Sequence, residues 1–196
     1  NALVKTGKLR QASSGAVIDD DGNLVKISPA KENALTELLN DISIDEHVVV
    51  FCQFAAEFDM VRNACYRSGQ RSYFELTGRK KEIDLWKKSG GVICVQASAG
   101  GVGVDLSDSR IAIFFSLGWT PAEYSQCCSR IRRTTQKSKK CFFCHLVSSE
   151  TIEEQVYAAV QRKQKVADVV LKGLSGGESK ECRKAKKQKQ SVSGKR

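Results

Sequence analysis

The sequence predicts an α/β fold in which a parallel sheet carries helices on both of its faces. Strand-like apolar runs alternate with helix-like segments along the chain, and the links between them are short. The run Val48–Cys52 is continuously apolar, as expected for a strand that is buried on both sides. With 196 residues, 41% of them hydrophobic, the chain can bury one full core.

The elements of this fold can be assigned in chain order. Leu9–Ile27 is predicted to form two short strands around the turn Asp19–Gly22. Ser28 then caps a helix that has Pro29 at its first position. The remaining elements are predicted as strand Val48–Cys52, helix Ala55–Ser68, strand Ser72–Leu76, helix Lys80–Lys88, strand Gly91–Gln96, strand Ile111–Phe115, a helix from Pro121, strand Lys140–Val147 and helix Thr151–Leu171.

A cluster of arginines follows the capping box Thr120–Glu123, which opens its helix. On a continuous helix, Gln126, Arg130 and Arg133 would project from one face, because they are four and three residues apart. Guanidinium groups match phosphate oxygens bidentately, so the cluster favours a phosphate ligand. A solvated basic face is the alternative.

A glycine-rich loop, Ala99–Leu106, follows the predicted strand Gly91–Gln96. It is a poor dinucleotide fingerprint, because the third glycine is missing, and a tight structural turn remains the alternative. Since this loop and the arginine cluster follow neighbouring strands, we expect them at one edge of the sheet, where they would suit a polyphosphate. The phosphate-cradling sequence Gly-x-x-x-x-Gly-Lys-Ser/Thr does not occur in the 196 residues, and Asp45–His47 precedes its strand, which argues against a metal site there.

Eight cysteines without a secretory signal favour a reducing compartment and free thiols. Cys141–His145 has the spacing of a haem attachment site, and Cys127 and Cys128 could add zinc ligands. A strand at this position would place Cys141 and Cys144 on opposite sides of the sheet, so we expect buried thiols and no metal.

The charge of the chain is uneven. The net charge is +10, and Glu178–Arg196 alone carries eight Lys or Arg against two Glu. We expect this tail to be disordered. Its role could be to contact nucleic acid, to act as a nuclear localisation signal, or only to increase solubility. The expected divisions are an N-terminal strand extension at 1–27, one domain at 28–173 and the tail at 174–196. The opening Asn1, with Met60 as the only methionine, suggests a piece of a longer polypeptide.

The segment Val48–Leu171 resembles the second RecA-like lobe of a superfamily-two helicase, closest to the Swi/Snf-type ATPases and in particular to their phage and bacterial branch. The matching stretches, in family order, are Val48–Phe54, Ala99–Leu106, Trp119–Pro121, the arginine motif Gln126–Gln136 and Thr151–Glu154. The chain departs from the family pattern at Ser129, Arg132 and Thr135, and Asp105 stands where these ATPases usually carry Asn.

The resemblance implies a P-loop NTPase fold without its own phosphate loop, with ATP and Mg²⁺ held mainly by an N-terminal lobe that this chain lacks. Arg133 and Arg130 would then be arginine fingers. The family also implies roles for Gly103, Asp105 and Gln126 at the nucleotide, and for Gln96, Ser98, Thr77 and Gly78 on nucleic-acid phosphates.

The favoured function is half of an ATP-dependent helicase or translocase on DNA, more readily duplex than single-stranded, which is inactive as an isolated fragment. A non-enzymatic nucleic-acid-binding or interaction module with a degenerate helicase fold is the alternative. A dinucleotide-binding domain is less favoured, because the acidic residue lies inside the loop. No apolar run reaches membrane-spanning length, so we expect a cytoplasmic protein in a bacterium or phage-infected cell, or a nuclear one in a eukaryote.

Overall fold

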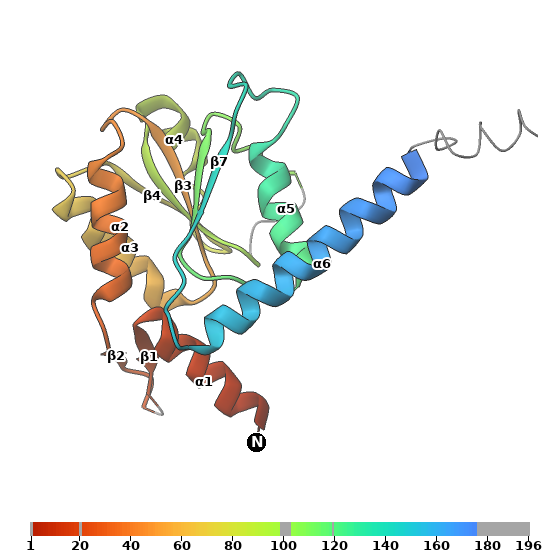
Figure 1. The fold of residues 1–196 in the computed structure, drawn as a ribbon. Coiled ribbons are helices and arrows are strands. Elements are labelled where there is room, and N and C mark those ends of the chain that lie inside the picture. The colour runs from red at the N-terminus through yellow and green to blue at the C-terminus, as the bar shows by residue number, and fades with distance from the viewer. Residues whose placement is uncertain (1, 20, 99–102, 119, 176–196) are drawn as a thin grey trace, which may run out of the picture. The chain divides into compact units, whose positions relative to one another are not determined.

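The computed structural model describes residues 2–19, 21–98, 103–118 and 120–175, and the chain divides after Val160 into two units (Figure 1). The first unit holds the sheet, and the second begins at Gln161. In chain order the elements are α1 (Ala2–Ser14), β1 (Ala16–Ile18), β2 (Leu24–Lys26), α2 (Ala30–Asn40), β3 (His47–Cys52), α3 (Ala55–Arg67), β4 (Tyr73–Leu76), α4 (Ile83–Ser89), β5 (Gly91–Gln96), β6 (Ile111–Phe114), α5 (Pro121–Ile131), β7 (Phe142–His145) and α6 (Ile152–Ser175).

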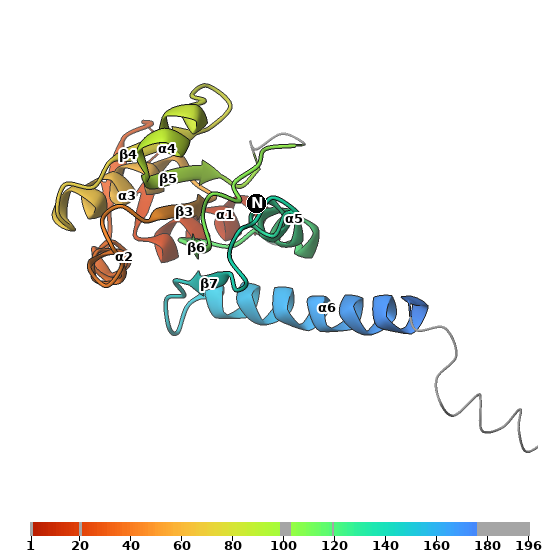
Figure 2. The ribbon, with the colours of Figure 1, turned by 90° about the horizontal axis from the view of Figure 1, so that it is seen from above.

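Strands β3 to β7 form one parallel sheet in the order β4-β5-β3-β6-β7, which confirms the predicted α/β fold. Strand β3 is central, and its residue Val48 pairs with Val92 of β5 on one side and with Ile111 of β6 on the other. Helices lie on both faces of the sheet (Figure 2). This position explains why β3 is continuously apolar, because both of its faces pack against other parts of the protein.

Successive residues of β3 point into two separate cores. Val48 and Val50 pack with side chains of α2 and α3, whereas Val49 and Phe51 pack with side chains of α4 and α5. All four residues are fully buried, and each such side chain contributes about 1.5–3 kcal/mol to folding. The two cores fix the strand register, since a slip by one residue would exchange the faces.

The N-terminal prediction was wrong in part, because Leu9–Ser14 belongs to helix α1 and only the later residues form the strands β1 and β2. Gly15 ends the helix with φ of +107°, and its N–H donates to the Ala12 carbonyl at 3.0 Å. A Cβ atom at Gly15 would lie 2.6 Å from the Ser28 carbonyl oxygen, so only glycine fits this junction.

Two further elements differ from their predicted bounds. The helix predicted at Lys80–Lys88 begins at Ile83, because Thr77 donates its N–H to the Lys80 carbonyl at 2.8 Å and closes a turn. The last strand covers only Phe142–His145, while its neighbour Cys141 packs against one core and Cys144 against the other. The prediction that these two thiols face opposite sides of the sheet is thus confirmed.

No helix in the described part of the chain combines the length and apolarity needed to cross a membrane.

Candidate nucleotide and nucleic-acid sites

Helix α5 begins as the sequence predicts. The Thr120 hydroxyl accepts the Glu123 N–H at 3.4 Å, and Pro121 occupies the first turn. The Glu123 carboxylate does not complete the capping box in the structure but accepts the Gln53 side-chain amide at 3.0 Å. The start of α5 is therefore tied to the loop that follows β3.

The predicted common face of Gln126, Arg130 and Arg133 is wrong. Helix α5 ends at Ile131, so Arg133 lies beyond it. The Arg130 side chain is 2% exposed, whereas those of Gln126 and Arg133 are exposed. Helical periodicity explains the burial, because Arg130 shares a face with the buried residues Cys127 and Ile131.

The segment that carries Arg133 is fastened to the loop that precedes β6. Arg133 Nη2 donates to the Val104 carbonyl at 3.4 Å, and the backbone N–H of Leu106 donates to the Arg130 carbonyl at 3.1 Å. Gly103 has φ of +110°, and among the described residues no atom lies within 4 Å of the place that a Cβ atom would take, neighbours in the chain left aside. The structure thus brings Gly103, Asp105 and Arg133 together, while 99–102 and Trp119 lie outside the described residues.

Asp105 is the centre of a small hydrogen-bond network. Its carboxylate accepts the Ser107 N–H at 2.9 Å and the Thr135 hydroxyl at 3.0 Å, and the Ser107 and Thr135 hydroxyls lie 2.6 Å apart. Burial alone would raise the pKa of Asp105, but the hydrogen bonds from Ser107 and Thr135 and the charge of Lys87 outweigh it and hold this pKa below its ordinary value. Asp105 is therefore an anchoring carboxylate that is ionised at neutral pH.

The arginine segment meets Val104–Leu106 of the glycine-rich loop at the amino ends of the strands, and not at the expected edge, because β5 and β6 flank β3 and are not neighbours. The predicted nucleic-acid residues lie at the opposite ends of the strands. The Gln136 side-chain amide donates to the Ser109 carbonyl at 2.8 Å. The Ser109 hydroxyl in turn donates at 2.6 Å to the backbone carbonyl of His47, the first residue of β3. Since α5 runs back against the strands, its end returns to their amino ends (Figure 1). Thr77 and Gln96, by contrast, stand at the carboxyl ends of β4 and β5.

Three of the four predicted nucleic-acid residues line one open hollow of about 530 Å³. This hollow is lined by Ala55, Phe58, Arg62, Glu75, Thr77, Gly78, Arg79, Lys80 and Gln96. The fourth residue, Ser98, is exposed two residues beyond the end of β5. The hollow follows the carboxyl ends of two neighbouring strands, where open α/β sheets commonly bind ligands.

Sequence reasoning missed the cations of this hollow, Arg62, Arg79 and Lys80. Glu75 pairs with Arg62 at 2.6 Å and with Lys80 at 3.0 Å, and the Thr77 hydroxyl accepts the N–H groups of Arg79 and Lys80. The run of basic residues directly after Thr77–Gly78 was the available signal. Arg62 lies on α3, far from Thr77 in sequence, so the sequence around Arg62 does not indicate that it lines this hollow.

The parallel sheet with helices on both faces defines a RecA-like α/β lobe. The family model described as helicase conserved C-terminal domain matches residues 30–135, and the chain belongs to this family. A crystal structure described as the C-terminal part of the Fun30 ATPase domain has the same fold, with a TM-score of 0.58 and 24% identity over 66% of this chain and 44% of that one.

Sequence relatives narrow the class to the Swi/Snf-type ATPases, as the motifs indicated. The chain is 28% identical over 191 residues to the chromatin-remodeling ATPase INO80 of Debaryomyces hansenii, covering 92% of this chain and 13% of that protein. It is 25% identical over 161 residues to the DNA repair protein rhp54 of Schizosaccharomyces pombe, covering 77% and 19%. The chain thus spans less than a fifth of the length of either relative.

Proposed function

We propose that this chain is the second lobe of an ATP-driven translocase on DNA, and that Arg133 is its arginine finger. The observation that carries the proposal is the placement of Arg133, which is exposed yet held beside Val104 and Asp105 by the contacts between the two segments. A guanidinium fixed at the surface can stabilise charge that develops on a phosphate bound by an opposing lobe.

The residues present fit the phosphate end of ATP. Arg133 offers planar N–H donors, and Gly103 has no side chain to keep a ligand from its backbone, with no other described residue within 4 Å of its Cβ position. ATP, with its Mg²⁺, would supply the phosphoryl bond whose cleavage drives the cycle, and both would be held mainly by the other lobe. Gln126 is exposed on α5 and could reach the same ligand, whereas Arg130 would first have to turn out of the core.

Nucleic acid would bind at the hollow beyond β4 and β5. Gly78 allows a strand to approach its backbone, Thr77, Gln96 and Ser98 offer polar side chains, and the nearby cations supply charge that attracts phosphates. Such contacts position a strand without reading its sequence. The names of the two relatives refer to chromatin remodelling and to DNA repair, which supports DNA as the partner. Within this proposal the DNA is a duplex, and the location is nuclear or cytoplasmic.

The decisive experiment joins this chain to a first lobe that carries a phosphate-cradling loop and measures DNA-stimulated ATP turnover. Arg133→Ala is expected to lower kcat by about 10³ to 10⁵, the range known for arginine fingers. Arg132→Ala is the matched control, because Arg132 is also exposed but stacks over the Phe143 ring at 4.5 Å. The control should retain turnover, and the chain alone should show none.

Two results would contradict the proposal. Substantial ATP turnover by the isolated chain would show that the site is complete without another lobe. A joined protein that binds DNA but never hydrolyses ATP would instead support the alternative, a nucleic-acid-binding module that keeps the fold without the activity. The departures at Ser129 and Thr135 are the observations on which this alternative rests.

A further inference from the structure

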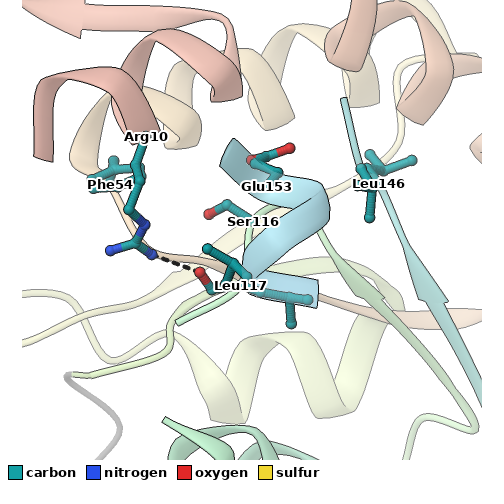
Figure 3. Close-up of a pocket in the computed structure, with 8 residues that line it drawn as sticks. Arg10, Phe54, Ser116, Leu117, Leu146 and Glu153 are labelled. Atoms are coloured by element: carbon teal, nitrogen blue, oxygen red, sulfur yellow. Dashed lines mark hydrogen bonds between the residues drawn. The ribbon is translucent and has the colours of Figure 1, made fainter. Parts of the chain in front are cut away.

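The Arg10 side chain of helix α1 reaches the loops at the carboxyl ends of β3 and β6. Its Nη2 donates to the Leu117 carbonyl at 2.6 Å, and its guanidinium carbon lies 5.3 Å from the centre of the Phe54 ring. Figure 3 shows Arg10 extending from α1 toward Leu117 with Phe54 beside it. Phe54 follows β3 and Leu117 follows β6, so one arginine bridges two loops that are far apart in sequence.

The loops after β3 and β6 are also linked to each other, through the carboxylate of Glu57. The Ser116 hydroxyl donates to the buried Glu57 carboxylate at 2.8 Å, and the Gln53 N–H donates to the same carboxylate oxygen at 2.8 Å. The Gln53 side chain reaches Glu123 in the first turn of α5. Leu117 therefore stands between an anchored serine and the start of the helix that leads to Arg133.

The surroundings of Arg10 favour an arginine over any other cation. Burial lowers the pKa of Arg10, and the nearby carboxylates of Glu57, Glu123 and Glu153 act against this shift. A half-buried guanidinium can donate in the plane of its fork and stack on a ring at the same time. An ammonium group at this position could provide one of these contacts but not the stacking geometry.

Further contacts hold the end of α1 in place. Lys8 donates to the Ile18 carbonyl, and the Ser148 hydroxyl, in the loop before α6, donates to the Ser13 carbonyl at 2.8 Å. Helix α1 thus meets the hairpin, the loops after β3 and β6, and the loop after β7. Of these contacts, the one made by Arg10 is directed at the segment that begins α5.

We propose that Arg10 is a positioning residue that fastens α1 to Leu117 in the loop after β6, so that a displacement of α1 is passed on to the start of α5. The consequence for Arg133 rests on the proposed function, whereas the fastening itself does not. Arg10 does not touch a ligand in this scheme. It sets the position of the helix from whose end the arginine segment continues.

Amide hydrogen exchange on the 196-residue chain tests the fastening without nucleotide or DNA, so its outcome is separate from that of the ATPase assay. Arg10→Met keeps the apolar stem but removes the charge and the donors. We expect amides in 116–126 to exchange about tenfold faster or more, because the variant loses a hydrogen bond from a charged group. Amides of β3 and β5 should stay unchanged and serve as the reference for global unfolding.

Arg62→Met is the matched control, because Arg62 also lies over an aromatic ring, that of Tyr73 at 5.1 Å, and pairs with Asp59 and Glu75 far from 116–126 in sequence. It should leave exchange in 116–126 at the native rate. If Arg10→Met fails to fold, Arg10→Lys decides, with an expected rise of about threefold in the same segment. Unchanged exchange in 116–126, or an equal rise in β3 and β5, would overturn the proposal.

Discussion

Asp105 and Thr135 stand where the Swi/Snf-type ATPases usually carry Asn and Gly, and in this chain the two departures are hydrogen-bonded to each other. The Thr135 hydroxyl donates to the Asp105 carboxylate, which also accepts from the backbone of Ser107. A glycine could not supply this donor. The pair therefore gives a physical reason for a threonine at a position where the family motif has a tight turn.

Replacing Thr135 by valine tests this explanation, since valine keeps the shape of the side chain and loses its hydroxyl. We expect Thr135→Val to lower the free energy of unfolding by about 1 kcal/mol, the usual contribution of one hydrogen bond. Urea denaturation measures the change. Thr134→Val, at the exposed neighbouring position, is the control and should be close to native. Equal effects of the two substitutions would remove the special role of Thr135.

Lys31 and Glu153 form a nearly buried ion pair. Lys31 is 5% exposed, and its ammonium group lies 2.5 Å from the Glu153 carboxylate and 2.7 Å from the Phe115 carbonyl. Lys31→Met leaves the carboxylate without its cation, and we expect a loss of about 3–5 kcal/mol in chemical denaturation. Combining it with Glu153→Gln should recover much of this loss. No recovery in the double variant would show that packing, and not the stranded charge, dominates.

At the scale of elements, β7 and α5 are joined by an aromatic cluster around His145. The imidazole stacks on Phe114 with ring centres 5.0 Å apart and lies 3.1 Å from the Tyr124 hydroxyl, and Tyr157 of α6 borders it at 5.2 Å. Burial lowers the pKa of His145. The neutral imidazole is thus the form that the folded protein holds.

The lowered pKa of His145 predicts a stability loss on mild acidification. Below about pH 6.5 the unfolded chain protonates His145, whereas the folded protein keeps the imidazole neutral because its pKa is lowered. Protonation therefore favours the unfolded state, and the free energy of unfolding, which has its full value above about pH 6.5, decreases as the pH falls. Melting temperatures at about pH 7.5 and pH 5.5 should show a smaller fall for His145→Phe than for the native chain. A native-like fall in His145→Phe would contradict the prediction.

The elements were predictable where one physical signal dominated. The buried run of β3 and the cap at Thr120 depend on local sequence, and both were recovered. Helix α1 was missed because its apolar residues do not gather on one face, and it is held by contacts such as that of Arg10 with Leu117. The burial of Arg130 was missed because only the spacing of the arginines was considered, whereas Arg130 lies on the face of α5 that carries the buried residues Cys127 and Ile131. The end of α5 at Ile131, which takes Arg133 out of the helix, was not predicted either.

At the scale of the whole molecule, positive charge is concentrated at the end of the chain, where 178–196 carries eight Lys or Arg and two Glu. If this segment binds DNA phosphates, deleting it should reduce the slope of log affinity against log salt by about 0.9 for each phosphate that the tail had neutralised. Fluorescence anisotropy with a DNA duplex at several salt concentrations measures the slope. A chain of full length with these Lys and Arg replaced by Gln is the matched control for length. An unchanged slope in both variants would exclude the tail from binding.

The return of α5 to the amino ends of the strands places Arg133 and the hollow beyond β4 and β5 at opposite ends of the same sheet. Two ligands bound at these places would not compete for space, so the lobe could hold both throughout a cycle. Any communication between them would have to pass through the sheet and α5. If the two sites bind ATP and DNA as proposed, substitutions that separate ATP turnover from DNA binding should be found between the two ends, along the strands of the sheet and along α5 itself.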